Sequence, residues 1–151
     1  MNSVYVDGNS VYVATDKGLS ISSDSGSSFT NMITASGLGS NYLTDVYAIG
    51  STVYAATSDR GISISTNGGT AFSTFTTNEG LGHNNNNAIF ADGSKIYAGT
   101  WGGLSISDNN GLSFLNKTTA NGLGHNTILS IFTIGSSIYT GNYGGLSIST
   151  D

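Results

Sequence analysis

The sequence predicts an all-β protein made of four copies of one four-stranded unit, and three observations support this. One pattern recurs at a spacing of 42 or 43 residues, marked by Tyr12, Tyr54, Tyr97 and Tyr139. Apolar residues either alternate with a period of two or form short runs rich in Val, Ile and Tyr, as in strands. Glycine-containing turns separate these runs. The period-two pattern excludes amphipathic helices.

Each unit opens with two apolar strands joined by a tight turn. The first strand is expected at residues 4–6, 46–48, 89–91 and 131–133, and the second at 11–14, 53–56, 96–99 and 138–141. Glycine in the intervening turns supplies the positive φ that hairpins require. Because nearly every position of both strands is apolar, we expect neighbouring structure to cover both of their faces.

The third and fourth strands of each unit differ from the first two. The third alternates apolar residues with serine at 19–21, 62–64, 104–106 and 146–148, so one face is packed and the other is polar or lined by small side chains. The fourth is short and built around Phe29, Phe72 and Phe114. Burial is therefore expected to fall from the first strand outward. In the linkers to the next unit, Leu38, Leu81 and Leu123 are expected to fill the space between units.

This gradient is what the blade of a β-propeller requires, with an inner strand wedged between neighbours and an outer strand near water. We expect a single domain over residues 1–151, with blades at 3–44, 45–87, 88–129 and 130–151. The last blade lacks its outermost strand. A β-sandwich is the structural alternative, but it does not predict a unit that recurs every 42 or 43 residues.

An arc of four such blades leaves an apolar face at each end, larger than soluble monomers usually expose. The chain either closes on itself as a four-bladed ring or pairs with a second copy into a ring of about eight blades. We favour the homodimer, because four blades require unusually strong wedge angles. A fragment of a longer structural or adhesive repeat array is a further alternative.

The hairpin between the third and fourth strands carries a repeated motif. It reads Ser-x-Asp-x-Gly-x-x-Phe at 22–29 and Ser-x-Asn-x-Gly-x-x-Phe at 65–72 and 107–114, and it begins again at 149–151. The motif resembles the Asp-box (BNR) repeat of sialidases, sortilin-type receptors and photosystem II assembly-factor-like propellers. The adjoining segments resemble two-component-regulator-type propeller repeats. The resemblance implies a β-propeller in which the following residues are structural: Ser22, Asp24, Gly26, Phe29, Ser65, Asn67, Gly69, Phe72, Ser107, Asn109, Gly111, Phe114, Ser149 and Asp151.

Composition limits the possible partners. Nine acidic and four basic residues give a net charge of -5, and the basic residues are dispersed. No nucleic-acid partner is expected, since binding phosphates needs clustered Lys and Arg. No segment approaches the roughly 20 apolar residues of a membrane span. With no cysteine, thiolate metal sites are excluded, and no cofactor or metal is expected. The Gly-, Ser-, Thr- and Asn-rich composition favours an extracellular or periplasmic bacterial protein.

The most variable positions of the repeat predict a binding face. Because neighbouring strands are antiparallel, the linkers and the turns between second and third strands share one face. Its variable turns carry Asp16, Lys17, Asp59, Arg60, Trp101 and Tyr143. Exposed aromatic side chains of this kind stack on sugars or peptides, which predicts a carbohydrate or protein ligand. Alternatively, the two aromatic side chains fold back over their own blades.

His83 and His125 share one linker position and complete the candidate ligand-binding residues. Two imidazoles hold a metal only with a third ligand, so we interpret them as polar loop residues. We expect no catalytic residues. The sialidase resemblance implies three arginines and a Tyr/Glu pair, but Arg60 and Glu79 are the only arginine and glutamate. The sequence thus predicts a non-catalytic binding or scaffold module; a relative of sialidases or other carbohydrate-active enzymes is the alternative.

Overall fold

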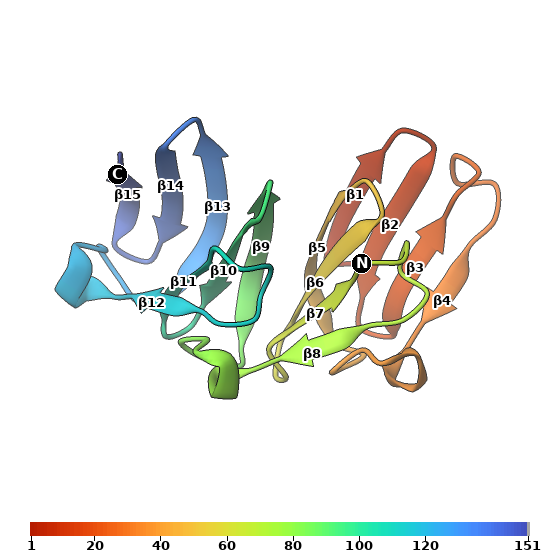
Figure 1. The fold of residues 1–151 in the computed structure, drawn as a ribbon, viewed down its shortest axis with the longest axis horizontal. Helices are drawn as coiled ribbons and strands as arrows, with labels where there is room; N and C mark the ends of the chain where they lie inside the picture. Colours follow the sequence, from red (N-terminus) through yellow and green to blue (C-terminus); the bar gives the residue numbers. More distant parts are fainter. Residues whose placement is uncertain (151) are drawn as a thin grey trace.

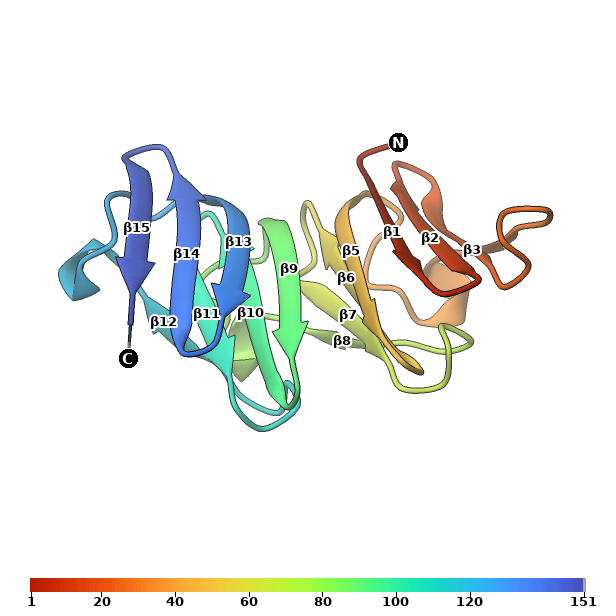
Figure 2. The same ribbon diagram turned by 90° about the horizontal axis from the view of Figure 1, so that it is seen from above.

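The computed structural model describes residues 1–150, so the predicted hairpin residue Asp151 lies outside the described residues. Regular structure in this part of the chain consists of β-strands and three single-turn 3-10 helices. The strands form four antiparallel sheets that stand side by side in an arc (Figures 1 and 2). The predicted all-β fold of repeated blades is confirmed. The arc is open, with β1 and β15 in its two end blades, so the four-bladed ring does not form within the described residues (Figure 2).

Each blade contains its strands in sequence order, from the inner strand to the outer one. The first blade comprises β1 (Ser3–Asp7), β2 (Ser10–Thr15), β3 (Gly18–Ser22) and β4 (Thr30–Met32). The second comprises β5 (Leu43–Ile49), β6 (Thr52–Thr57), β7 (Ile62–Ser65) and β8 (Ser73–Phe75). The third comprises β9 (Asn86–Asp92), β10 (Lys95–Thr100), β11 (Gly103–Ser107) and β12 (Leu115–Lys117). The fourth comprises β13 (Ile128–Ile134), β14 (Ser137–Asn142) and β15 (Gly145–Ser149).

The inner strands β5, β9 and β13 begin slightly earlier than the predicted blade boundaries, at Leu43, Asn86 and Ile128. In each of them the pairing with the second strand shifts register near this start, for example between Leu43 and Asp45. Such a β-bulge bends the strand and increases its twist. The extra residues therefore connect the linker to the regular part of the inner strand.

The core lies between the blades, because both faces of each inner blade pack against a neighbour. Between blades 1 and 2, Leu19 of one blade and Val53 and Phe72 of the next belong to one buried cluster. Between blades 2 and 3, the equivalent positions Ile62, Ile96 and Phe114 form a second cluster. Each blade therefore depends on its neighbour for stability, as the predicted wedge requires.

Burial does not fall from the inner strand outward, and this prediction was wrong. All four residues of β7 are buried, whereas β1 has no buried residue and β5 has three. β1 belongs to an end blade, so Val4 and Val6 on its outer face have no neighbouring blade to cover them, whereas the equivalent Val46 and Ala48 of β5 are buried against the first blade. In the two inner blades the central serine of the third strand is also buried, because a linker covers it: Ser63 Oγ accepts a hydrogen bond from the amide of Gly39 (3.0 Å), and Ser105 Oγ accepts one from the amide of Gly82 (2.9 Å).

The linkers begin with the 3-10 helices η1 (Thr34–Ser36), η2 (Thr77–Glu79) and η3 (Thr119–Asn121), each followed by a glycine in the left-handed conformation. Leu38 and Leu81 are both 3 % exposed between blades, as predicted, whereas Leu123 is only partly buried. Thr76 and Glu79 form a capping box on η2, and the hydrogen bond from the Thr76 amide lowers the pKa of Glu79. The only glutamate of the chain thus has a structural role.

The inner strands carry a column of aromatic rings that the sequence analysis did not identify. Ring centroids are 4.6 Å apart between Tyr5 and Tyr47, 4.7 Å between Tyr47 and Phe90, and 6.2 Å between Phe90 and Phe132. Burial, followed by the hydrogen bond with Tyr5, raises the pKa of Tyr47 to about 12. Contact between rings of successive blades adds to the apolar packing that joins the inner strands.

Candidate functional site

We define the loop face as the surface formed by the three linkers and by the turns that follow β2, β6, β10 and β14. All eight residues predicted to bind a ligand are exposed on it: Asp16, Lys17, Asp59, Arg60, His83, Trp101, His125 and Tyr143. They come from all four blades. Asp16 and Lys17 belong to the first blade and Tyr143 to the fourth, so the structure spreads the candidates along the arc and does not form one cluster from them (Figure 2).

Trp101 is held on the loop face with its indole exposed. The side chain is 53 % exposed and stacks on His83, with ring centroids 5.9 Å apart and an interplanar angle of 21°. Its backbone amide donates to the carbonyl of Asn85 (3.1 Å), and its indole Nε1 lies 3.4 Å from Asn87 Oδ1. The linker before the blade therefore orients the indole, and more than half of its surface stays open to solvent.

Tyr143 has the equivalent position in the fourth blade and a similar environment. It is 70 % exposed, and its ring makes a T-shaped contact with that of His125, with centroids 5.5 Å apart and an interplanar angle of 62°. Blades 3 and 4 thus present the same pair, an imidazole from the linker and an aromatic ring from the turn. Neither ring is buried over its own blade.

The two histidines have the same structural role. His83 Nδ1 accepts a hydrogen bond from the amide of Asn85, and His125 Nδ1 accepts one from Thr127, both at 2.9 Å. In the first linker, Ser40 Oγ accepts the equivalent hydrogen bond from the amide of Tyr42 (3.1 Å). Each imidazole therefore closes its own loop through Nδ1 and keeps Nε2 for other partners. Within residues 1–150, no three His, Cys, Asp or Glu side chains gather as metal ligands would.

Tyr42 is a candidate that the sequence analysis missed. It follows the first linker, is 58 % exposed, and its carbonyl accepts a hydrogen bond from Ser58 in the turn after β6 (3.0 Å). Asn85 has the equivalent position before blade 3, and its carbonyl accepts the equivalent hydrogen bond from the amide of Trp101. The sequence carried a signal for it, because no other linker has an aromatic residue at this position.

The charged candidates lie on blades 1 and 2 of the loop face. They are Asp16, Lys17, Asp59 and Arg60. Asp16 Oδ1 accepts a hydrogen bond from the side chain of Asn2 (2.7 Å). The Arg60 amide donates to Thr57 Oγ1 (2.9 Å), which fixes the turn and leaves the guanidinium exposed. The candidates predicted from the sequence therefore change along the arc from charged side chains on the first two blades to aromatic side chains on the last two, and Tyr42 adds an aromatic side chain to the second blade.

The predicted hairpin motif has one geometry in three blades. The first serine of each motif donates to the Asx side chain two residues later, at 2.7 to 2.8 Å, and accepts from a glycine amide at 2.9 Å. In the first blade, hydrogen bonds from Ser28 and Ser22 lower the pKa of Asp24 to about 2. Each hairpin uses its own side chains as hydrogen-bond partners, which favours a structural role.

Comparison with known proteins supports the fold. No protein-family model matches the sequence, and neither does any curated protein sequence. Among solved structures, the chain is similar to the extracellular domain of a hybrid two-component system from B. thetaiotaomicron, with a TM-score of 0.77, 23% identity, and coverage of 97% of this chain and 22% of that one. It is also similar to an ancestral GH74 enzyme, with a TM-score of 0.70, 20% identity, and coverage of 99% and 22%.

A third similar structure is YCF48 bound to D1 peptide, with a TM-score of 0.59, 17% identity, and coverage of 97% of this chain and 51% of that one. The chain thus spans about a fifth of the length of the first two proteins and half of the third. At these identities the likeness concerns the fold alone, and together with the four sheets it shows a β-propeller-type architecture. No helix within the described part of the chain is long and apolar enough to cross a membrane.

Proposed function

We propose that this protein is a non-catalytic binding module that recognises a carbohydrate or a peptide through its loop face. The observation that carries the proposal is the set of exposed aromatic side chains on three successive blades, Tyr42, Trp101 and Tyr143. Rigid aromatic side chains lose little conformational entropy on binding and offer a large apolar surface with a polar tip. Trp101 and Tyr143 are already oriented by a histidine of the preceding linker.

The similar structures support a recognition role. One is the extracellular domain of a two-component system, and another is YCF48 with a bound peptide. We extend this role to the present chain, with an extracellular or periplasmic location in a bacterium. The charged residues of blades 1 and 2 would then add specificity at one end of the contact, and the aromatic residues of blades 3 and 4 would supply most of the affinity.

Because Trp101 is the only tryptophan, its fluorescence reports on this face alone. Titration with a glycan library and with a library of peptides should each be followed by the shift of Trp101 emission, and one class should give a saturable shift. Trp101→Ala and Tyr143→Ala should then weaken binding by roughly tenfold or more, measured by calorimetry. Leu112→Ala, an exposed apolar side chain on a hairpin away from this face, is the control. If no member of either class shifts the emission, the proposal is wrong.

A carbohydrate-active enzyme is the second candidate, because the chain is similar to a GH74 enzyme. Glycoside hydrolysis ordinarily uses two carboxyl groups that flank the scissile bond. Here Glu79 caps η2, and the carboxylate of Asp45 accepts hydrogen bonds from Ser3 and from the Ile89 amide. These contacts favour structural roles for both groups, which supports the non-catalytic proposal. Release of the aryl group from aryl glycosides or sialosides by the purified chain would favour the enzyme instead.

We also propose that two copies associate through the ends of the arc. The outer face of blade 1 exposes Val4 and Val6, at 53 % and 57 %, and that of blade 4 exposes Leu146 and Ile148, at 67 % and 57 %. These are the residue types that meet between blades inside the chain. Head-to-tail contact at both ends would give a closed ring of about eight blades.

A further inference from the structure

The inner strands line a hollow near the turns that connect them to the second strands, at the end of the blades opposite the loop face. It has a volume of about 410 Å³, and its lining includes Tyr5, Tyr47 and Phe90 of blades 1 to 3. Asp7 and Asp92, the last residues of β1 and β9, also line it. We call this hollow the inner pocket, and the inference drawn from it does not depend on the proposed function.

Aromatic rings form one continuous wall of the inner pocket. The ring centroid of Tyr47 lies 4.6 Å from that of Tyr5 and 4.7 Å from that of Phe90, and all three side chains are partly buried. Each ring is held by a ring of a neighbouring blade, so the wall does not depend on the uncovered ends of the arc. The face of an aromatic ring has a negative electrostatic potential, which attracts cations.

Two exposed carboxylates stand beside this wall. Within residues 1–150, the carboxylates of Asp7 and Asp92 have no hydrogen bond or ion pair. The carboxylate of Asp45, in contrast, accepts hydrogen bonds from both neighbouring blades. Burial and the hydrogen bond with Tyr5 raise the pKa of Tyr47 to about 12, and the negative charges of Asp92 and Asp7 add to this rise. Both carboxylates therefore lie within electrostatic reach of the same phenol.

The turns of the blades do not require these carboxylates. Each inner strand ends immediately before a glycine with φ between 56° and 59°, at positions 8, 50, 93 and 135. Aspartate precedes this glycine in blades 1 and 3, but Ile49 and Ile134 precede it in blades 2 and 4. The same turn therefore forms with an apolar residue in the acidic position, and turn geometry does not explain Asp7 and Asp92.

No basic side chain of residues 1–150 lines the inner pocket. Lys95 is the nearest in sequence and stands opposite Asp92 in the hairpin of blade 3. Its side chain lines a separate hollow together with Asp108. The other three basic residues belong to the loop face and to β12. The inner pocket thus has two negative charges in its described lining and no positive one.

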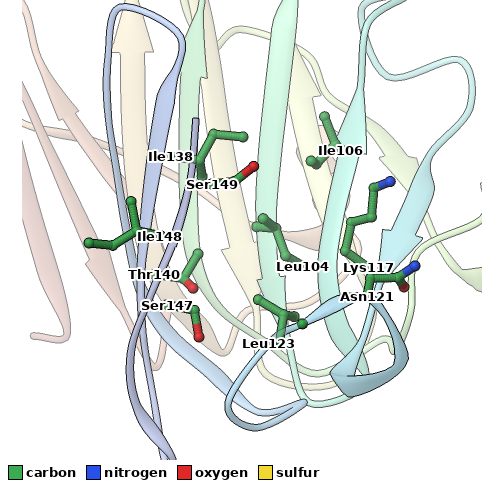
Figure 3. A pocket seen from close by; sticks show the side chains of 11 residues that line it. Leu104, Ile106, Lys117, Asn121, Leu123, Ile138, Thr140, Ser147, Ile148 and Ser149 are labelled. Atoms are coloured by element: carbon green, nitrogen blue, oxygen red, sulfur yellow. The ribbon is translucent and has the colours of Figure 1, made fainter. Parts of the chain in front are cut away.

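A second hollow, the groove between β15 and the third linker, lacks this chemistry. Figure 3 shows its lining, which is mainly apolar, with Lys117 and Asn121 at the rim and no acidic residue. Its Ser147 Oγ already accepts hydrogen bonds from the amide of Gly124 and from the side chain of Asn142, both at 2.9 Å. Of the two hollows, only the inner pocket therefore combines aromatic rings with negative charge.

We propose that the inner pocket binds an alkylammonium ion, either a free amine or the side chain of a lysine. Its carbon atoms pack on the rings of Tyr5, Tyr47 and Phe90, and its charge is balanced by Asp7 and Asp92. Aromatic faces are the surfaces that recognise such ions, and the volume is within the range of small-ligand sites, about 300–1,000 Å³. A hard metal ion fits less well, because it needs a shell of oxygen ligands and no three acidic or histidine side chains gather within residues 1–150.

The probes are tetramethylammonium, butylamine and a capped lysine peptide, each titrated into the whole chain at constant ionic strength and followed by NMR. Binding should be saturable and should shift the amides of Gly8 and Gly93, while the indole signal of Trp101 stays in place, so the inner pocket and the loop face are tested separately. tert-Butanol, a neutral molecule of similar shape to tetramethylammonium, should bind about tenfold more weakly. Equal binding of the neutral molecule contradicts the proposal. A lysine peptide that binds more tightly than both amines would identify the source as a protein.

Variants of the two aspartates test the role of charge. Asp7→Asn and Asp92→Asn keep the size of each side chain and remove its negative charge. Each should weaken the binding of tetramethylammonium by about threefold to fivefold, the range for exposed ion pairs, and the double variant should weaken it further. Asp108→Asn is the matched control, because Asp108 is exposed on a hairpin of the same blade as Asp92 and lies outside the pocket. A double variant that binds as well as this control would overturn the proposal.

The central ring of the wall is tested at Tyr47. Tyr47→Phe keeps the aromatic face and should retain the affinity for tetramethylammonium within about twofold, whereas Tyr47→Leu should lower it by about fivefold. The NMR spectrum of each variant shows whether the blades stay folded, and the aspartate variants keep the test valid if Tyr47→Leu does not fold. The proposal is wrong if none of the probes gives a saturable shift up to tens of millimolar. It is also wrong if calcium at equal ionic strength displaces tetramethylammonium, because the pocket would then be a metal site.

Discussion

Leu104 in blade 3 and Leu146 in blade 4 occupy the same position of the repeat, yet 4 % of the first side chain is exposed and 67 % of the second. The phenylalanines before the outer strands show the same contrast, since Phe72 is 9 % exposed and Phe29 of blade 1 is 50 % exposed. The inner blades are covered on both faces, and each end blade on one. Burial in this protein is therefore a property of the neighbouring blade as much as of the residue.

This difference separates two kinds of constraint. Within a blade, hairpins and strand pairing are local, and the same pattern recurs from copy to copy. Between blades, stability comes from apolar faces that match in pairs, and the last face at each end has no partner within residues 1–150. Apolar patches of this kind on soluble proteins usually mark contact sites. A partner that covers the end faces would give the end blades the same burial as the inner ones. Without such a partner the end blades stay more exposed.

The largest effect should come from covering the end faces. If two copies close the arc, light scattering should give a mass near twice 15.4 kDa. Val6→Asp and Leu146→Asp should each return the chain to a single copy, because a buried unpaired carboxylate is strongly unfavourable. Leu112→Asp adds the same charge at a side chain that is 74 % exposed on a hairpin, and it should leave the dimer intact. A single-copy mass at all concentrations would show that the ends stay uncovered.

A matched pair of substitutions then measures the difference between an inner and an end blade. In the Val6→Asp background, Leu104→Ala should lower the free energy of unfolding by about 2–5 kcal/mol, because it leaves a cavity between two blades. Leu146→Ala should lower it by no more than about 0.5 kcal/mol, as for other exposed positions. Urea denaturation measures both. Equal costs would mean that the end face is already packed against other structure.

The sequence predicted what is local and repeated. The spacing of Tyr12, Tyr54 and Tyr97 gave the blade, and alternation with serine located the third strands, because both depend on residues close together in the chain. The expected decrease of burial from the inner strand outward was wrong, because burial depends on which neighbouring structure covers each strand. No pattern within one blade contains that information.

The candidate site was predicted in part for the same reason. Trp101 and Tyr143 were candidates because of their place in variable turns, whereas Tyr42 lies in a linker outside those turns and was not singled out. The open space beside Gly122 could not be predicted, since each linker contains the same glycine after its 3-10 helix, and only Gly37 and Gly80 lie against the backbone of a phenylalanine. Only the position of the outer strand in the next blade shows whether that glycine faces a backbone or an open space.

The contacts between inner strands offer a smaller test of the same contrast. Asp45 accepts hydrogen bonds from Ser3 Oγ (2.6 Å) in blade 1 and from the Ile89 amide (2.9 Å) in blade 3, so one carboxylate joins three blades. Asp45→Ala should cost about 1.5–3 kcal/mol, the range for hydrogen bonds to charged groups. Asp45→Asn should recover part of this loss, and Asp108→Ala, at an exposed hairpin position, should have little effect. A cost of Asp45→Ala no larger than that of Asp108→Ala would contradict the bridging role.

The smallest effect concerns pH and again distinguishes an end blade from the inner ones. Asp24 of blade 1 has an Asn counterpart in blades 2 and 3, and its pKa is lowered from 3.8 to about 2, first by the hydroxyl of Ser28. A carboxyl group with a lowered pKa in the folded state stabilises it above the unfolded-state pKa, and this stabilisation disappears as the pH falls from about 4 to 2. Asp24→Asn keeps the acceptor oxygen but cannot titrate, so its urea midpoint should fall less steeply than that of the parent chain over this range. Glu79 titrates in both chains and cancels in the difference. Parallel curves for the two chains would show that the hairpin of the first blade does not sense the charge of Asp24, and that all three hairpins are equivalent despite the exposed end.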